Sequence, residues 1–172
     1  MSAIEFQKVL EIEQIQIVRD LAIEIWHEHF TSIIGLAQVE YMLDKFQSKV
    51  AIIQQIESGF YYYLISEQNE NLGYLAIKFI PGKLFLSKLY VKSSFRGKGY
   101  GKLAIQFLIQ LARPGGLQVI TLSVNKDNFK ALKAYQKMGF EIINAKIEDI
   151  GGGFVMDDYE MEIRLSTTNS TI

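Results

Sequence analysis

Three glycines, Gly97, Gly99 and Gly101, alternate with other residues in the middle of the chain. They follow an apolar stretch, Leu84–Val91, that favours a strand, and they precede Leu103–Ala112, which has the apolar spacing of a helix. Glycine lets backbone N–H groups come close to a ligand, and a helix start directs its free N–H groups and positive dipole end to the same point. The pattern predicts a site for an anion, in the first instance a phosphate or pyrophosphate.

Three cationic side chains, Arg96, Lys98 and Lys102, accompany these glycines. Two familiar phosphate loops do not fit the spacing. A Walker loop needs glycine at position 96 and serine or threonine at 103, where the chain has Arg96 and Leu103. The dinucleotide fingerprint needs its third glycine at position 102, which is Lys102. An ordinary glycine-rich turn between a strand and a helix is the alternative.

A second group of residues follows the next predicted strand, Gln118–Val124. Asn125 and Asn128 belong to a run of residues that favour helix N-caps. Tyr135 comes later in the predicted helix, on the same apolar face as Ala131. On spacing alone, Tyr135 is equally suited to core packing.

Two adjacent carboxylates, Asp157 and Asp158, follow the run Gly151–Gly153, which we expect to be flexible. Neighbouring side chains of a strand point to opposite faces, so at most one of the two would face a bound molecule. From the residues alone, a solvated acidic turn is an equally good interpretation of this pair.

Composition limits the classes of function. The 172 residues, 49% of them hydrophobic, suit one domain, which we place at 1–165 with a disordered tail at 166–172. A net charge of −1 gives no reason to expect nucleic acid or an anionic membrane as partner.

The absence of cysteine excludes disulfides and thiolate catalysis. His27 and His29 are two positions apart on a predicted helix and do not share a face, so no metal site is expected. Neither a leader sequence nor an apolar run of about 20 residues is present, which favours a cytoplasmic protein.

The other elements follow from periodicity and turn residues. We expect a mixed α/β sheet of about seven mostly antiparallel strands, with helices on both faces, in the order β-α-α-β-β-β-α-β-α-β-β. Helices are predicted at Glu11–Phe30, Leu36–Phe46 and Lys49–Glu57, and strands at Ala3–Val9, Phe60–Ser66, Leu72–Phe79, Phe140–Ala145 and Phe154–Leu165.

This order of elements resembles the core of the GNAT (Gcn5-related N-acetyltransferase) superfamily over nearly the whole chain. The loop at Arg96–Lys102 resembles the family's acetyl-CoA pyrophosphate loop. Asn128–Phe140 resembles its segment Asn-x-x-Ala-x-x-x-Tyr-x-x-x-Gly-Phe at full spacing, and Tyr41–Phe46 is similar to small polyamine-type N-acetyltransferases. The resemblance implies a GNAT-like fold and the transfer of an acetyl group from acetyl-CoA, by direct attack, to a primary amine of a small molecule, with a polyamine as the candidate.

The resemblance also implies roles for single residues. Main-chain groups at the end of the strand would hold the pantetheine arm, the loop amides the pyrophosphate, and the two asparagine side chains would touch the cofactor. Tyr135 would protonate the departing thiolate, and Asp157 and Asp158 would hold a second ammonium of the acceptor. The residues implied in cofactor binding are Leu89, Tyr90, Val91, Arg96, Gly97, Lys98, Gly99, Tyr100, Gly101, Lys102, Asn125 and Asn128.

One departure from the family concerns the base. Many members place a glutamate on the strand before the loop, whereas Leu84–Tyr90 contains no carboxylate. A water chain or a carboxylate from elsewhere would have to replace it, and the candidates are Glu28, Glu40, Asp157 and Asp158. A CoA-binding regulatory or interaction module without catalysis is therefore the rival interpretation. A protein N-terminus or lysine stays open as acceptor, and the chain is expected to be a monomer or a homodimer.

Overall fold

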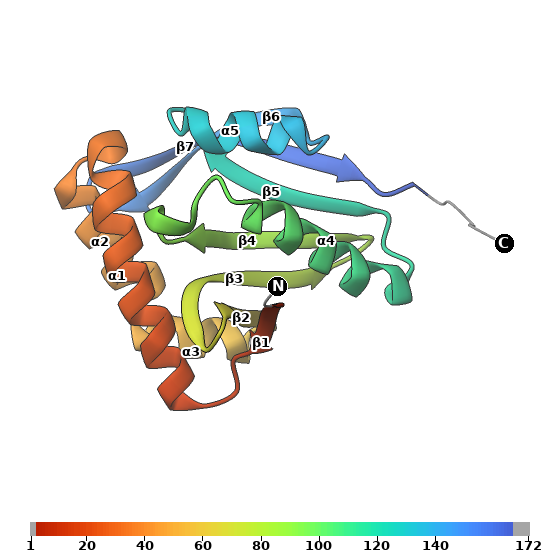
Figure 1. Ribbon diagram of the computed structural model, residues 1–172. Helices are drawn as coiled ribbons and strands as arrows, with labels where there is room; N and C mark the ends of the chain where they lie inside the picture. Colours follow the sequence, from red (N-terminus) through yellow and green to blue (C-terminus); the bar gives the residue numbers. More distant parts are fainter. Residues whose placement is uncertain (1–2, 167–172) are drawn as a thin grey trace, which may run out of the picture. The chain divides into compact units, whose positions relative to one another are not determined.

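Seven strands join in one mixed sheet in the computed structural model, which describes residues 3–166. Their order is β1-β2-β3-β4-β5-β7-β6. The pairs β1–β2, β2–β3, β5–β7 and β6–β7 are antiparallel, and β4–β5 is parallel. The predicted mixed α/β fold is confirmed. The predicted order of elements had two helices between the first and second strands, and the structure has three there. Along the chain (Figure 1) the elements are β1 (Ile4–Lys8), α1 (Ile12–Ile34), α2 (Leu36–Gln47), α3 (Lys49–Glu57), β2 (Phe60–Glu67), β3 (Glu70–Ile80), β4 (Lys83–Val91), η1 (Ser93–Phe95), α4 (Tyr100–Ala112), η2 (Arg113–Gly115), β5 (Val119–Asn125), α5 (Phe129–Lys137), β6 (Glu141–Gly151) and β7 (Phe154–Arg164).

The chain divides into two compact units, each described by itself below. Unit 1 comprises Met1–Lys78 and Ser87–Gly101, and unit 2 comprises Phe79–Leu86 and Lys102–Ile172. The single domain expected over 1–165 stays a prediction. The expected disordered tail lies outside the described residues except for Ser166, which is exposed.

The helices of unit 1 cover one face of its strands. Tyr62, Tyr74 and Tyr90 lie on that face, since Tyr62 bonds to α3 through Gln55 and Tyr90 packs on Trp26 of α1. The apolar stripe of α1 is buried because its members recur every three or four residues. These members are Ile15, Val18, Leu21, Ala22, Ile25, Trp26 and Phe30.

Helix α1 is one turn longer than predicted. It continues past Phe30 to Ile34 and stops at Gly35, whose φ of 84° ends the helix and whose N–H donates to the carbonyl of Thr31. No glycine or proline precedes Gly35 in this turn, so nothing ends the helix earlier. His27 and His29 therefore lie more than one turn before the end of the helix.

The hairpin β6–β7 of unit 2 corrects two predictions. Strand β6 runs to Gly151 instead of ending at Ala145, and Gly151 pairs with Phe154. Gly152 and Gly153 are then the two turn residues, with φ of 62° and 81°. Two-residue hairpin turns favour positive φ at both positions, because this matches the strand twist. The glycines form a tight turn rather than the flexible run that was expected.

Candidate functional site

The predicted anion loop lies between β4 and α4. Helix α4 begins at Tyr100, three residues earlier than predicted, so Gly101 belongs to its first turn. Gly97 and Gly99 have backbone φ angles of 75° and 89°, which residues other than glycine rarely adopt. A Cβ on Gly97, Gly99 or Gly101 would meet no atom within 4 Å. The space over this backbone is open, and the first-turn N–H groups of α4 follow it directly. This arrangement fits a bound pyrophosphate.

Aromatic contacts hold the loop in shape. The rings of Phe95 and Tyr100 meet edge to face with centroids 6.1 Å apart, and the Nζ of Lys98 lies 5.2 Å from the Phe95 centroid. The hydroxyl of Tyr100 donates to Glu67 over 2.8 Å, and this hydrogen bond raises the pKa of Tyr100. The loop is thus attached to the end of β2.

Arg96 braces the loop with its side chain. Its Nε donates to the carbonyl of Val91 over 2.9 Å, and its Nη1 lies 3.3 Å from the Nδ1 of His29. The guanidinium therefore links the loop to the end of β4 and to α1.

The aromatic side chain near the end of β4 is packed among other rings. Tyr90 lies 5.5 Å from Trp26, 5.9 Å from Phe30 and 5.5 Å from Tyr74 between ring centroids. A Cβ on Gly73 would clash with the carbonyl oxygen of Tyr90, so β3 approaches β4 closely at this point. Sequence analysis did not single out Gly73, although a glycine inside a strand signals such an approach.

Lys88 of β4 is a half-buried cation that sequence analysis missed. Its Nζ donates to the Oε1 of Gln55 over 2.8 Å and lies 5.4 Å from the Tyr62 ring centroid. Burial lowers the pKa of Lys88 to about 8. Gln55 is far from Lys88 in the sequence, on α3, so no local sequence pattern predicts this hydrogen bond.

We expect Lys88→Met to raise the free energy of unfolding at pH 7. The charged ammonium is disfavoured by burial, and its pKa is lower in the folded than in the unfolded chain, where it is near 10.4. Wild-type stability should therefore rise as the pH increases from about 8 to about 10.5, and the variant's advantage of about 1–2 kcal/mol should shrink over that window. Urea unfolding at pH 7 and pH 10 measures both values.

The control for Lys88 is the exposed Lys8. Lys8→Met should change the free energy of unfolding by no more than about 0.5 kcal/mol at either pH, as surface substitutions do. A loss of stability in Lys88→Met at pH 7 would mean that the bond to Gln55 outweighs the cost of burying the ammonium.

In unit 2, Asn125, Asn128 and Tyr135 lie in the order predicted. The Oδ1 of Asn125 accepts a hydrogen bond from the N–H of Asp127 over 2.9 Å. Asn128 takes the N-cap position of α5, is 7% exposed, and makes no side-chain capping bond to the helix. The Tyr135 ring meets Phe140 edge to face at 5.4 Å between centroids. Burial raises the pKa of Tyr135 to about 12, so the phenol keeps its proton at neutral pH.

Asp157 and Asp158 lie within β7, not in a turn, and point to opposite faces. Asp157 forms an ion pair with Lys126. Asp158 stands opposite Asn125 of β5 in the register. Burial, together with the charges of Asp157 and Glu148, raises the pKa of Asp158 to about 6. The solvated acidic turn is therefore wrong as an interpretation of this pair.

Asp158 belongs to a row of acids on one face of unit 2. Glu160 and Glu162 follow it at alternate positions of β7, and Glu148 lies on the same face of β6, because it pairs with Met156. Glu162 is bound by Lys83, and Glu160 accepts from the Nδ2 of Asn144 over 3.0 Å. We call Glu148, Asp158, Glu160 and Glu162 the acidic face.

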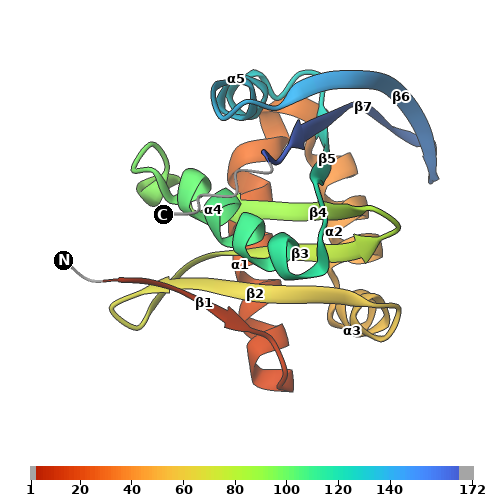
Figure 2. The same cartoon turned by 90° about the vertical axis from the view of Figure 1, so that its right-hand side faces the viewer.

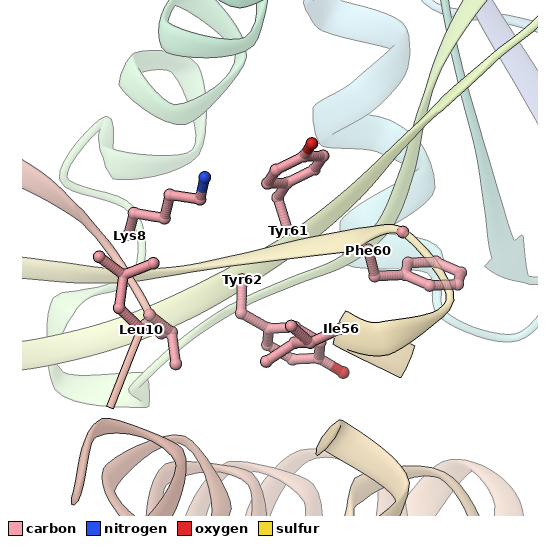
Figure 3. Close-up of a pocket in the computed structure, with 8 residues that line it drawn as sticks. Lys8, Leu10, Ile56, Phe60, Tyr61 and Tyr62 are labelled. Atoms are coloured by element: carbon pink, nitrogen blue, oxygen red, sulfur yellow. The ribbon is translucent and has the colours of Figure 1, made fainter. Parts of the chain in front are cut away.

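A shallow pocket of about 200 Å³ lies elsewhere, in unit 1. Figure 3 shows Lys8 and Tyr61 on one side of β2, and Leu10, Ile56 and Tyr62 on the other. The Nζ of Lys8 lies 4.5 Å from the Tyr61 centroid. None of the site residues predicted from the sequence lines this pocket, whose lining is Lys8, Val9, Leu10, Ile56, Gly59, Phe60, Tyr61 and Tyr62.

The predicted site residues thus fall into two groups. Leu89–Val91 and the loop up to Gly101 belong to unit 1. Lys102 and the residues Asn125, Asn128, Tyr135, Asp157 and Asp158 belong to unit 2. Between residues 3 and 166, none of the helices is both long and apolar enough to cross a bilayer.

Comparison with known proteins agrees with this arrangement. The sequence model of the acetyltransferase (GNAT) family matches residues 22–140. The chain is 25% identical to the spermidine N(1)-acetyltransferase of Thermoplasma acidophilum, over 90% of this chain and 96% of that protein. It is 30% identical to the peptidyl-lysine N-acetyltransferase YjaB of Salmonella typhimurium, over 51% of this chain and 54% of that protein. The chain spans about half the length of several curated relatives that it matches.

Solved structures show the same fold. The crystal structure of the PaiA N-acetyltransferase from Thermoplasma acidophilum in complex with coenzyme A superposes with a TM-score of 0.78 at 24% identity. The match covers 94% of this chain and 99% of that chain.

Proposed function

Because the chain belongs to the GNAT family of acetyltransferases, we propose that it transfers an acetyl group from acetyl-CoA to a primary amine of a small molecule. The observation that carries this proposal is the loop between β4 and α4. It combines three glycines, open space over the backbone and the start of a helix. These features together suit the pyrophosphate of acetyl-CoA.

The donor would lie along residues of both β4 and the loop. Strand β4 pairs with β5 from Lys83 to Leu86, and its later residues up to Val91 lie beyond this ladder. We propose that the main chain of Leu89–Val91 binds the pantetheine arm and that the amides of Arg96–Lys102 bind the pyrophosphate. Asn125 and Asn128 are proposed as further cofactor contacts. When bound, acetyl-CoA supplies a thioester, which is an acetyl group activated toward amines.

The acceptor amine must be neutral to attack, although a primary amine has a pKa near 10.4 by the lysine reference value. A group that takes up its proton is needed. Among the described carboxylates Asp158 carries a raised pKa, about 6, which is closer to neutrality than that of an ordinary aspartate. We therefore favour Asp158 over Asp157, whose carboxylate already pairs with Lys126. The main-chain N–H at Val91 is proposed to stabilise the oxyanion, and Tyr135 to protonate the leaving thiolate.

The acidic face supports a cationic acceptor. Asp158 and Glu160 would attract a molecule with two or more ammonium groups, and holding one ammonium would orient another amine for attack. We propose a diamine or polyamine as the acceptor. A relative that matches over nearly the full chain length is a spermidine N(1)-acetyltransferase, which agrees with this choice.

A thiol-release assay over a panel of amines tests the activity. We expect release of CoA with spermidine, and less with butylamine or with peptides that offer a lysine or a free N-terminus. The rival function is a CoA-binding module without catalysis, which the absence of a carboxylate on β4 favours. Acetyl-CoA binding by calorimetry, without thiol release from any amine, would establish that rival.

We expect Asp158→Asn to lower kcat/KM for both amines, because the proposed base is removed. The loss should be at least about tenfold larger for spermidine than for butylamine, because a charge-assisted contact to the second ammonium is worth about 1.5–3 kcal/mol. The wild-type value for spermidine should rise as the pH increases through about 6, since the carboxylate must be ionised. This rise of kcat/KM between about pH 5 and pH 7, the acidic limb of the pH profile, should be absent in Asp158→Asn.

Asp157→Asn is the matched control, because it removes the neighbouring charge on the opposite face. It should keep most of the preference for spermidine and keep the acidic limb. Equal losses in both variants, or a wild type without any preference between the two amines, would remove Asp158 from substrate choice.

A further inference from the structure

Strand β6 is an unusually exposed edge of the sheet. It stands at the end of the strand order, next to β7 (Figure 2), and its residues Glu141–Asp149 are all exposed. Three isoleucines of this edge are 43%, 52% and 67% exposed, namely Ile142, Ile143 and Ile147. The opposite edge, β1, has five residues. Edge strands of monomers are usually short, interrupted or otherwise protected, so a long edge with exposed isoleucines indicates a partner.

The geometry of β6 restricts how a strand can pair with it. Between the irregularities at Ile142/Asn144 and Asp149/Gly151, the residues Asn144–Asp149 pair regularly with β7. In an antiparallel ladder alternate residues direct their N–H and C=O groups to one neighbour, and the others direct them outward. A second β6 related by a two-fold axis must therefore match outward residues with outward residues. This requires that the axis pass through a residue and not between two residues.

The charged residues of β6 then indicate at which residue the two-fold axis lies. With the axis at Ile147, Lys146 stands opposite Glu148 of the second copy, and Ile147 stands opposite itself. Every other centre from 144 to 149 puts Lys146 opposite isoleucine, asparagine, glycine or a second lysine. The same lysine and glutamate already lie 3.2 Å apart within one chain, so their side chains are on one face. Opposite charges directly across a strand pair stabilise it, and like charges destabilise it.

We propose that the protein forms a homodimer through antiparallel pairing of β6 with β6 of a second copy, centred on Ile147. The pairing extends the sheet across the two-fold axis and removes the exposed Ile147 side chains from water. The two Lys146–Glu148 pairs set the register, because exposed ion pairs add little affinity but like charges oppose association.

The test is the mass in solution, measured by light scattering after size-exclusion chromatography. We expect twice the chain mass of 19.7 kDa for the wild type. Lys146→Glu places glutamates opposite each other, and Glu148→Lys places lysines opposite each other. Each should weaken association at least tenfold and run as a monomer. The double variant, which exchanges the two charges, should be dimeric again although its composition of charges is unchanged.

A mixture of the two single variants gives the sharpest outcome. Lys146→Glu carries acids at both positions and Glu148→Lys carries lysines at both, so together they form two complementary pairs. We expect each to be monomeric alone and the mixture to be dimeric. Lys133→Glu on α5 is the exposed control and should stay dimeric. A monomeric wild type, dimeric single variants, or a mixture that stays monomeric would each overturn the proposal.

Discussion

Replacing Gly101 by valine should lower the affinity for acetyl-CoA at least about 100-fold and leave the fold intact. Gly101 lies in the first turn of α4, its φ is not in the positive region, and an added Cβ would meet no protein atom within 4 Å. The protein itself therefore accepts the side chain. The valine would occupy the space through which the proposed pyrophosphate reaches the first N–H groups of the helix. Losing one or two charge-assisted hydrogen bonds, at about 1.5–3 kcal/mol each, accounts for this factor.

Gly101→Ala separates binding from folding still further. Alanine favours helix more than glycine by about 0.5–1 kcal/mol, so this variant should melt at the same or a higher temperature. Its affinity for acetyl-CoA should nevertheless fall. Calorimetric titration and thermal unfolding of the same samples measure the two effects independently.

Gly99→Val should also abolish binding, but it adds backbone strain, because the φ of Gly99 is 89°. Gly116→Val controls for that strain. Gly116 has a φ of 67°, and an added Cβ there would also meet no atom within 4 Å. It follows the far end of α4 and should lose stability without losing affinity. Wild-type affinity in Gly101→Val would show that the amides of this loop do not bind the pyrophosphate.

The order of the elements was predictable, because glycines, turn residues and apolar periodicity mark it locally. Element ends were less predictable. The chain after Phe30 contains nothing that either favours or ends a helix before Gly35, so local sequence left the last turn of α1 undecided. The run Gly151–Gly153 indicated flexibility by composition. Only its pairing with β7 fixes Gly152 and Gly153 as a turn, and that pairing depends on residues of both strands.

The roles of charged residues were harder to predict than the positions of the motifs. That Asp157 and Asp158 point to opposite faces follows from strand geometry. Which of them meets Lys126 depends on the path of the chain after β5. Arg96 was expected to act through its charge, whereas its guanidinium binds Val91 and lies beside His29. Lys88 gave no signal, since its partner Gln55 comes from another element. Such contacts are set by tertiary packing.

Tyr135→Phe is expected to lower kcat by roughly 10- to 1000-fold with little change in the affinity for acetyl-CoA. Loss of a general acid generally costs about 10²- to 10⁴-fold, and water replaces part of its action. Phenylalanine keeps the edge-to-face contact with Phe140, so the end of α5 should stay in place. Only the proton donor is removed. Stopped-flow or steady-state thiol release, together with calorimetry, separates the two quantities.

The pH dependence of kcat is a second test of the role of Tyr135. Burial raises the pKa of Tyr135 to about 12, so the phenol stays protonated throughout pH 7 to 10. Wild-type kcat should therefore not fall over this range through loss of the tyrosine proton, and the ratio of wild type to Tyr135→Phe should stay constant. Tyr61→Phe, in the separate pocket on β2, is the control for removing a tyrosine hydroxyl and should keep its turnover. Wild-type turnover in Tyr135→Phe would make Tyr135 a packing residue and leave the thiolate to be protonated by water.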